Sequence, residues 1–197
     1  MKIHTLTFKE QVWGTAQKFI TELMVPYDEL VLEFCEFSDD LTTIVPITKP
    51  TKIKGGSLGS LSIDNESLFE ENLLPIKLEG AGLMHLKTGI DTFVEVNQLC
   101  NAKTEIGKLE VGGRAMIHAG VIDLLKVEMF SICRVFPRSS ISTLDIYGTC
   151  AIACDVTHSV FLHAGGRLKL FYTDFDKNKI ILDEGRSLTE YNGYLIG

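Results

Sequence analysis

The hydrophobic positions of this chain repeat one short pattern three times. An apolar residue and two others are followed by two apolar residues and a glycine at alternate positions. The copies start 33 and 35 residues apart and are Leu73-x-x-Ile76-x-Leu78-x-Gly80, Ile106-x-x-Leu109-x-Val111-x-Gly113 and Ile141-x-x-Leu144-x-Ile146-x-Gly148. Repetition at this period is typical of one supersecondary unit that is copied and stacked. The pattern therefore predicts an architecture before it indicates any chemistry.

The alternation of apolar and polar residues continues beyond this signature. With Ile76, Leu109 and Leu144 as position one of each copy, 25 of the 33 odd positions over twenty-one residues are Ile, Leu, Val, Met, Ala or Cys. The even positions carry most of the charged residues. A period of two with one apolar side is typical of half-buried strands, because successive side chains point to opposite faces. We predict that all three copies are β.

Each copy is too long to be one strand. Twenty-one extended residues would span roughly 70 Å, so a turn is needed inside each copy. Gly and Asp cluster at matching places in the first two copies, residues 88–91 and 120–123, and Asp occurs at the same place in the third, residues 155–158, which predicts turns there. Each unit of about 34 residues is then expected to hold two strands. A closing hairpin is predicted where alternation at residues 168–172 resumes at residues 180–182 after a polar turn.

The first 62 residues follow a different pattern. Residues 1–8 predict a strand, and Thr7-x-x-Glu10 is a capping box that predicts a helix, which ends before Pro26. Residues 29–37 and 41–47 predict two more strands, giving a small β-α-β-β module over residues 1–47. Residues 48–62 contain three lysines and no acid, and we interpret them as a linker or an extended arm. The β-repeat domain with its C-terminal hairpin is then expected over residues 63–197.

The predicted fold class is mainly β, with three repeats of about 34 residues after a small N-terminal α/β module. Three arrangements of the repeats agree with the pattern. They can stack as a solenoid, close into a pseudo-threefold prism, or pair as a two-sheet sandwich. Matching registers are compatible with stacking, whereas a count of three suits a prism.

Composition narrows the classes of protein. The 197 residues are 45% hydrophobic and 23% charged, which is ordinary for a soluble globular protein. A net charge of −7 argues against general nucleic-acid binding, since phosphate binding relies on clustered Lys and Arg. No long apolar run predicts a membrane helix, and the first residues lack the apolar core of a secretory signal. We therefore expect cytoplasmic synthesis, with five reduced cysteines.

One stretch could suggest a metal site, Cys150-x-x-x-Cys154 followed by His158 and His163. On one strand, residues four apart lie about 13 Å from each other, whereas zinc ligands all sit about 2 Å from the ion. Both cysteines also occupy odd, apolar positions. The chain has no P-loop, dinucleotide-binding, H-E-x-x-H or G-x-S-x-G motif. We therefore expect no metal, no cofactor and no catalytic residue.

Asp123 and His158 are the most unusual polar residues, because both occupy position fifteen of their copies. If neighbouring copies stack in register, equivalent residues lie about 5 Å apart, and the two could form a carboxylate–imidazole pair that orients a general base. Their place in the predicted turns favours a structural role instead. Only Ser159, next to His158, and Ser131, in a connector, offer a candidate nucleophile.

The predicted outward side carries more large apolar residues than a solvated face needs, which indicates an interaction surface. Its members are Leu83, Phe93, Met116, Ile122, Leu124 and Phe161. We therefore expect a non-enzymatic structural or assembly protein that binds copies of itself or other subunits, as in a virus particle or phage tail, and neither nucleic acid nor membrane. Two alternatives stay open. One is a module that binds a sugar, lipid or peptide. Carbohydrate sites normally display exposed aromatic residues, whereas Trp13 lies on the predicted apolar side of the helix. The other alternative is an enzyme that uses Asp123, His158 or Glu128.

Overall fold

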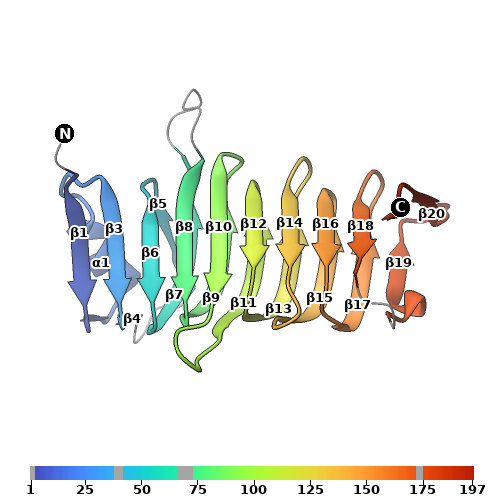
Figure 1. Ribbon diagram of the computed structural model, residues 1–197. Coiled ribbons are helices and arrows are strands. Elements are labelled where there is room, and N and C mark those ends of the chain that lie inside the picture. Colours follow the sequence, from blue (N-terminus) through green and yellow to red (C-terminus); the bar gives the residue numbers. More distant parts are fainter. Residues whose placement is uncertain (1–2, 38–41, 66–72, 172–174) are drawn as a thin grey trace.

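A computed structural model describes residues 3–37, 42–65, 73–171 and 175–197 of the chain. The chain is mainly β and winds into a solenoid of about 7 turns (Figure 1). Its strands stack into two sheets that face each other, sheet A in front in Figure 1 and sheet B behind. The predicted mainly β repeat fold is confirmed, and of the three arrangements the structure has the solenoid.

The strands of each sheet follow the order of the coils along the chain. In sheet A the described strands are β1 (Thr5–Lys9), β3 (Glu29–Glu33), β6 (Thr51–Lys54), β8 (Leu74–Glu79), β10 (Thr92–Asn97), β12 (Arg114–Ile117), β14 (Ile132–Val135), β16 (Thr149–Ile152), β18 (Arg167–Leu170), β21 (Tyr194–Ile196) and β20 (Thr189–Tyr191). In sheet B they are β2 (Val12–Trp13), β4 (Glu36–Phe37), β7 (Ser57–Ile63), β9 (Gly82–Thr88), β11 (Thr104–Val111), β13 (Gly120–Val127), β15 (Ser140–Ile146), β17 (Val156–Leu162) and β19 (Ile180–Leu182), with β5 (Ile44–Ile47) paired to β7. Successive coils pair in parallel.

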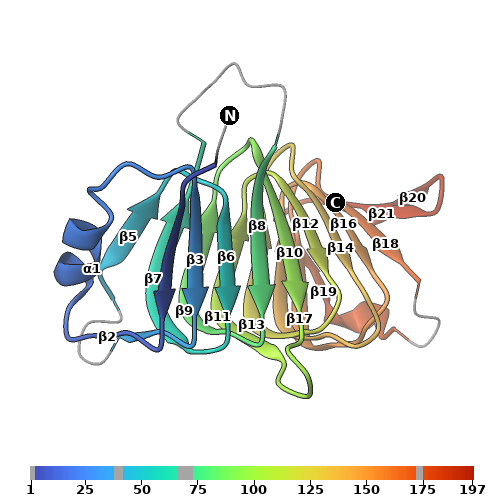
Figure 2. The ribbon, with the colours of Figure 1, turned by 60° about the vertical axis from the view of Figure 1, so that its left-hand side comes forward.

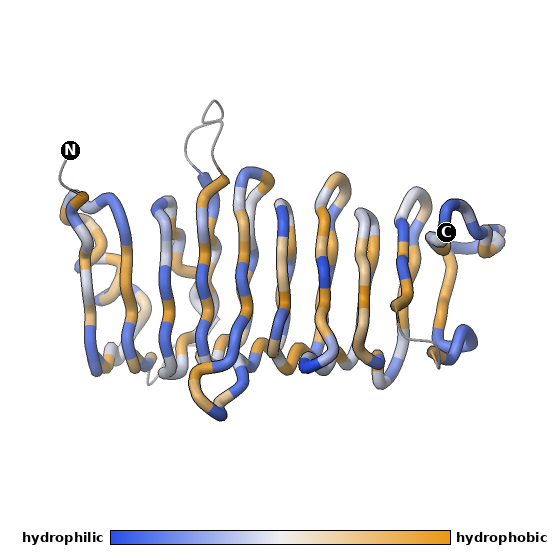
Figure 3. The backbone as a smooth tube through the Cα atoms, in the orientation of Figure 1, coloured by the Kyte–Doolittle hydropathy of each residue, from blue (hydrophilic) through white to orange (hydrophobic). Residues whose placement is uncertain are grey.

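The core lies between the sheets and consists of ladders of like side chains. Leu86, Leu109, Leu125 and Leu144 stand at the same register position of four neighbouring strands, and all are fully buried. Burial of one such leucine contributes about 1.5–3 kcal/mol relative to leaving it exposed. Polar residues alternate with these apolar ones along the strands (Figure 3). The predicted two-residue period is thus the direct result of stacking parallel strands on a shared core.

A line of bulges crosses sheet B and shifts this alternation. In β13 two consecutive residues, Asp123 and Leu124, point outward between the buried Ile122 and Leu125. In the ladder from β11 to β13, Ile106 pairs with Ile122, and the next pair is Lys108 with Leu124. The row between them, Gly107 and Asp123, is unpaired. An extra residue in a strand moves all residues beyond it to the other face. A strict count by twos therefore misplaces residues on one side of the bulge.

The signature glycines mark sharp corners of the solenoid. At Gly148 an added Cβ would lie 2.3 Å from the carbonyl oxygen of Glu128 and 2.6 Å from that of Ser131, so the corner has no room for a side chain. The turn predicted at residues 88–91 is present between β9 and β10. The turns predicted at residues 120–123 and 155–158 are wrong, because these residues enter β13 and β17. Each copy of the sequence pattern consequently spans three strands.

The spacing of about 34 residues arises because two kinds of corner alternate between sheet B and sheet A. The corner with glycine connects the buried Val111 to the buried Ala115, and the following one connects Val127 to Cys133 by a longer path. One repeat is therefore two coils. The first copy is out of register with the others, since its Ile76 lies in sheet A whereas Leu109 lies in sheet B.

The N-terminal helix begins later than predicted. Helix α1 (Ala16–Glu22) is capped by the side chain of Thr15, which accepts a hydrogen bond from the amide of Lys18. The capping box at Thr7 is wrong because the residues after it form β1 and β2. Residues 48–62, interpreted as a linker or arm, lie in the sheets instead as β6 and most of β7. The division into domains at residues 47 and 62 stays a prediction.

The C-terminal end differs from the predicted hairpin. Strand β18 pairs with β16 in sheet A, whereas β19 pairs with β17 in sheet B, so the two strands belong to successive faces of a coil. Because apolar and polar residues alternate in the same way in a coil and in a hairpin, the sequence pattern could not distinguish the two. Tyr172 and Asp174 of the predicted hairpin lie outside the described residues. A different hairpin, β20–β21, pairs antiparallel with β18 at this end of sheet A. A short 3-10 helix (Lys177–Lys179) precedes β19.

Candidate functional site

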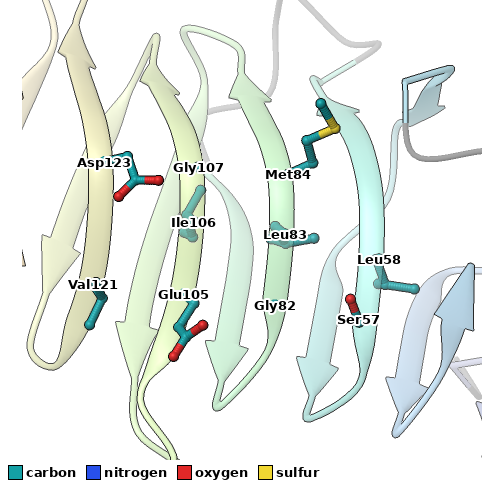
Figure 4. Close-up of a pocket in the computed structure, with 10 residues that line it drawn as sticks. All are labelled: Ser57, Leu58, Gly82, Leu83, Met84, Glu105, Ile106, Gly107, Val121 and Asp123. Carbon is teal, nitrogen blue, oxygen red and sulfur yellow. The ribbon is translucent and has the colours of Figure 1, made fainter.

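A shallow groove of about 340 Å³ crosses the outward face of sheet B at the line of bulges (Figure 4). It exists because Gly82 of β9 and Gly107 of β11 contribute no side chain. Met84 and Val121 provide apolar contact area at its edges, and Ser57 adds a hydroxyl. The groove is open to solvent along a strip that crosses four neighbouring coils.

Two carboxylates give this acidic groove its charge. Glu105 of β11 lies opposite Val121 of β13, and Asp123 stands two residues farther along β13, where its side chain points toward Gly107 in Figure 4. Diagonal neighbours of this kind are about 7–8 Å apart. Both carboxylates are exposed, and neither has an ion pair within the described part of the chain. The groove is therefore apolar with two uncompensated negative charges.

Asp123 and His158 are not neighbours. Asp123 is on β13 and His158 is on β17, and β15 lies between them. The Nδ1 atom of His158 is instead 2.7 Å from the Oγ atom of Ser142 on β15 and 3.1 Å from the Oγ1 atom of Thr157. The predicted proximity is wrong because one repeat is two coils, so equivalent residues are two strands apart.

The predicted interaction surface is divided among three places. Leu83 and Ile122 lie in the core, with only 4% and 1% of their surface exposed, because the bulge turns them inward. Leu124 and Phe161 are half-buried on the outward face of sheet B. The remaining two predicted members, Phe93 and Met116, lie on the outward face of sheet A.

Phe93 and Met116 belong to a second groove, which sequence reasoning did not identify. Its volume is about 420 Å³, and Ile132 with the side chains of Arg114 and Arg134 completes most of its lining. Arg114 lies opposite Ile132, and Met116 lies opposite Arg134, on the neighbouring strands β12 and β14. The two arginines could have been found as outward even positions, but their proximity requires knowledge of the strand pairing.

This basic face extends over the C-terminal half of sheet A. Strands β12, β14, β16 and β18 contain no Asp or Glu, whereas they carry Arg114, Arg134, Arg167 and Lys169. The N-terminal half of the same sheet is different, because its lysines pair across strands with glutamates, as Lys77 does with Glu95 at 3.5 Å. None of the three arginines has an ion pair among the described residues. Positive charge is thus concentrated on one face of a chain whose net charge is −7.

His163 forms a compact polar cluster at the C-terminal end of sheet B. Its two ring nitrogens lie 2.7 Å from carboxylate oxygens of Asp145 and Asp183, and its ring stacks on Tyr147 at 4.0 Å. The amide of Ala164 and the imidazole hold the pKa of Asp183 below its usual value. All hydrogen-bonding positions of the ring are used within the protein, which gives the cluster a structural role in joining β19 to the preceding coils.

The cysteines of the suspected metal stretch face the core. Burial raises the pKa of Cys154 to about 11, and the adjacent Cys133 thiol together with burial raises that of Cys150 well above its ordinary value. Such thiols stay protonated near neutral pH, and a protonated thiol is a poor metal ligand. Within the described ranges no three metal-binding side chains are grouped closely enough to hold an ion.

Neither a protein-family model, a curated protein nor a solved structure matches this chain. No described helix is long and apolar enough to cross a bilayer. The features that can carry a function are the two outward faces and the two ends of the solenoid.

Proposed function

We propose that this protein is a non-enzymatic structural or assembly protein, a subunit of a larger oligomeric particle of which a virus particle or a phage tail is one example. The observation that supports this proposal is the difference between the two ends of sheet A. At the C-terminal end the hairpin β20–β21 pairs with Arg167 and Leu168 of β18, and the edge strand is β20, which has three residues. Strand β1 is the last described strand at the other end, and α1 lies beside sheet B rather than over β1 (Figure 2).

The backbone of β1 is suited to accept another strand. The carbonyl of His4 accepts hydrogen bonds from the amides of Asp28 and Glu29, and the amide of Glu10 donates to the carbonyl of Glu33. The backbone amide and carbonyl groups of even-numbered residues therefore face β3. Thr5, Thr7 and Lys9 consequently direct their amide and carbonyl groups to the open edge. Such an edge is a template for strand addition, which natural proteins cover or bind through.

Apolar residues surround this edge. Ile3 is 70% exposed and Met24 is 75% exposed, and the segments that carry them meet where His4 bonds to the carbonyl of Pro26 at 2.8 Å. Phe8 is only half-buried, although it packs on the core ring of Trp13 at 5.2 Å. A strand from another copy or another subunit would bury these side chains, as the next coil does elsewhere in the solenoid.

Light scattering after size exclusion tests the proposal with the full chain and with Thr7→Pro. Proline at this position removes an amide that faces the open edge, so it blocks strand addition while the bonds from β1 to β3 remain. We expect the unaltered chain to form oligomers at about 100 μM, a concentration that populates any contact with a Kd in the low micromolar range. We expect Thr7→Pro to lower their mass. A monomeric wild-type chain under these conditions would contradict the proposed function.

A further inference from the structure

We infer that a second copy of this chain binds face to face, with the basic face of sheet A in one copy against the acidic groove of sheet B in the other. The inference rests on the proposed function and names the partner and the contact. In this interface Arg114 and Arg134 form ion pairs with Glu105 and Asp123 of the other copy. The contact is separate from the open edge of β1.

The charges of the two faces are complementary. Several outward charges elsewhere on the sheets are compensated within the chain, for example between Lys126 and Glu128 at 2.7 Å. The four residues of the inferred contact are exposed, and they form no ion pair within the described ranges. Two positive charges on one face and two negative charges on the other are complementary between copies. Complementary potentials guide association and exclude wrong partners.

The spacing of the charged residues also matches between the two faces. Arg114 and Arg134 are on neighbouring strands with an offset of two residues, since Arg114 lies opposite Ile132. Glu105 and Asp123 have the same relation across β11 and β13. Both diagonals therefore combine one strand spacing, about 4.8 Å, with the rise of two residues, about 6.6 Å. Equal separations allow both ion pairs to form at once, and the planar guanidinium group suits a carboxylate with two parallel hydrogen bonds.

Both faces also offer apolar area to the contact. In the basic face the other diagonal holds the side chains of Met116 and Ile132, which line the second groove. In the acidic groove the corresponding diagonal holds Val121 and Gly107, where one position is empty of side chain. Ile132 is 44% exposed, which leaves apolar area to bury. The contact would thus bury apolar side chains of both faces together with the four charged residues.

This contact has a consequence for the assembly. The two surfaces are different, so the interface is heterologous. One copy of a pair keeps its acidic groove free and the other keeps its basic face free. Heterologous contacts that do not close into a ring produce open chains of subunits. Such a contact explains how a solenoid with two opposite faces could extend a particle in the direction perpendicular to its sheets.

Charge reversal tests the inference in a Thr7→Pro background, where strand addition at β1 does not contribute. One variant carries Arg114→Glu and Arg134→Glu, and the other carries Glu105→Lys and Asp123→Lys. We expect each variant alone to lose at least tenfold in the association constant for self-association, measured by sedimentation equilibrium. A mixture of the two is expected to associate again, because every contact in it joins opposite charges.

A matched control carries Arg138→Glu and Arg186→Glu, two exposed arginines outside the contact that give the same change in net charge. This control should associate like the Thr7→Pro parent. The unaltered contact should also weaken when salt is raised from about 50 to 300 mM, because exposed charges are screened. Circular dichroism confirms that all variants keep the fold.

Four results would overturn the inference. If the Thr7→Pro parent is monomeric while the wild-type chain associates, the face contact fails and the proposed function stands. If the parent associates and the reversed variants associate equally well, the contact lies elsewhere. If the arginine variant instead loses binding to a heparin fragment or a DNA oligonucleotide without a change in self-association, the basic face binds a polyanion. A wild-type chain that never associates contradicts the proposed function as well.

Discussion

Replacement of Ile122 with alanine tests the line of bulges in sheet B. A strict two-residue alternation places Ile122 on the outward side together with Leu124, whereas the structure buries Ile122 to 1% exposure and leaves Leu124 outward. Removal of buried isoleucine atoms costs the transfer free energy and a cavity term, about 2–5 kcal/mol in total. For a chain of this size the melting temperature should fall by roughly 4–20 °C.

Leu124→Ala is the matched control, because it is a neighbouring aliphatic residue on the same strand. Its half-exposed side chain should contribute less than about 1 kcal/mol to the free energy of unfolding. Urea unfolding followed by far-ultraviolet circular dichroism and by fluorescence of Trp13 gives both free energies, provided that the two probes report the same transition. Equal losses in the two variants, or a larger loss for Leu124→Ala, would refute the bulge and restore the simple alternation.

Three further predictions concern the corners, the thiols and the His163 cluster. Gly148→Ala should destabilise the fold by about 1–3 kcal/mol in urea unfolding, because its Cβ would collide with backbone oxygens, whereas Gly82→Ala should be nearly neutral, and equal effects would refute this. A thiol reagent should modify Cys100 quickly in the native protein and the four buried cysteines slowly, so a fast phase that persists in Cys100→Ser would contradict this burial. The lowered pKa of Asp183 means that its stabilisation is present above the ordinary aspartate pKa and is lost as the pH falls through the lowered value. Asp183→Asn should therefore have a lower melting temperature than the wild type at pH 7, and the difference should shrink below about pH 4; a difference that is constant with pH would contradict the role of this carboxylate.

The strands could be predicted from the sequence because their signal is local. Alternation around Leu109 and Leu144 records which side of each strand meets the core, and this requires no knowledge of the partner strand. The bulge has no comparable local signal, since Asp123 and Leu124 give no sign that both point outward. As a result the count by twos is correct for Leu125 and wrong for Ile122, three residues away.

The candidate site was only partly predictable, because it depends on which strands are neighbours. Phe93 and Met116 were identified as outward apolar residues, and both line the basic face. Arg114 and Arg134 acquire meaning only when β12 and β14 are paired, which the sequence leaves open. The proposed closeness of Asp123 and His158 failed for the same reason, since an intervening coil separates strands that the repeat pattern treats as adjacent.

The alternation of short and long corners restricts the lengths that this solenoid can have. Each coil lengthens both sheets by one strand spacing, about 4.8 Å. Insertion of a single coil would place two corners of the same kind side by side. Duplication of one whole repeat, from Leu109 up to Leu144, adds two coils and keeps short and long corners alternating. The length of such a protein can therefore change most easily in steps of two coils, close to 10 Å, without any change in the cross-section that its partners contact.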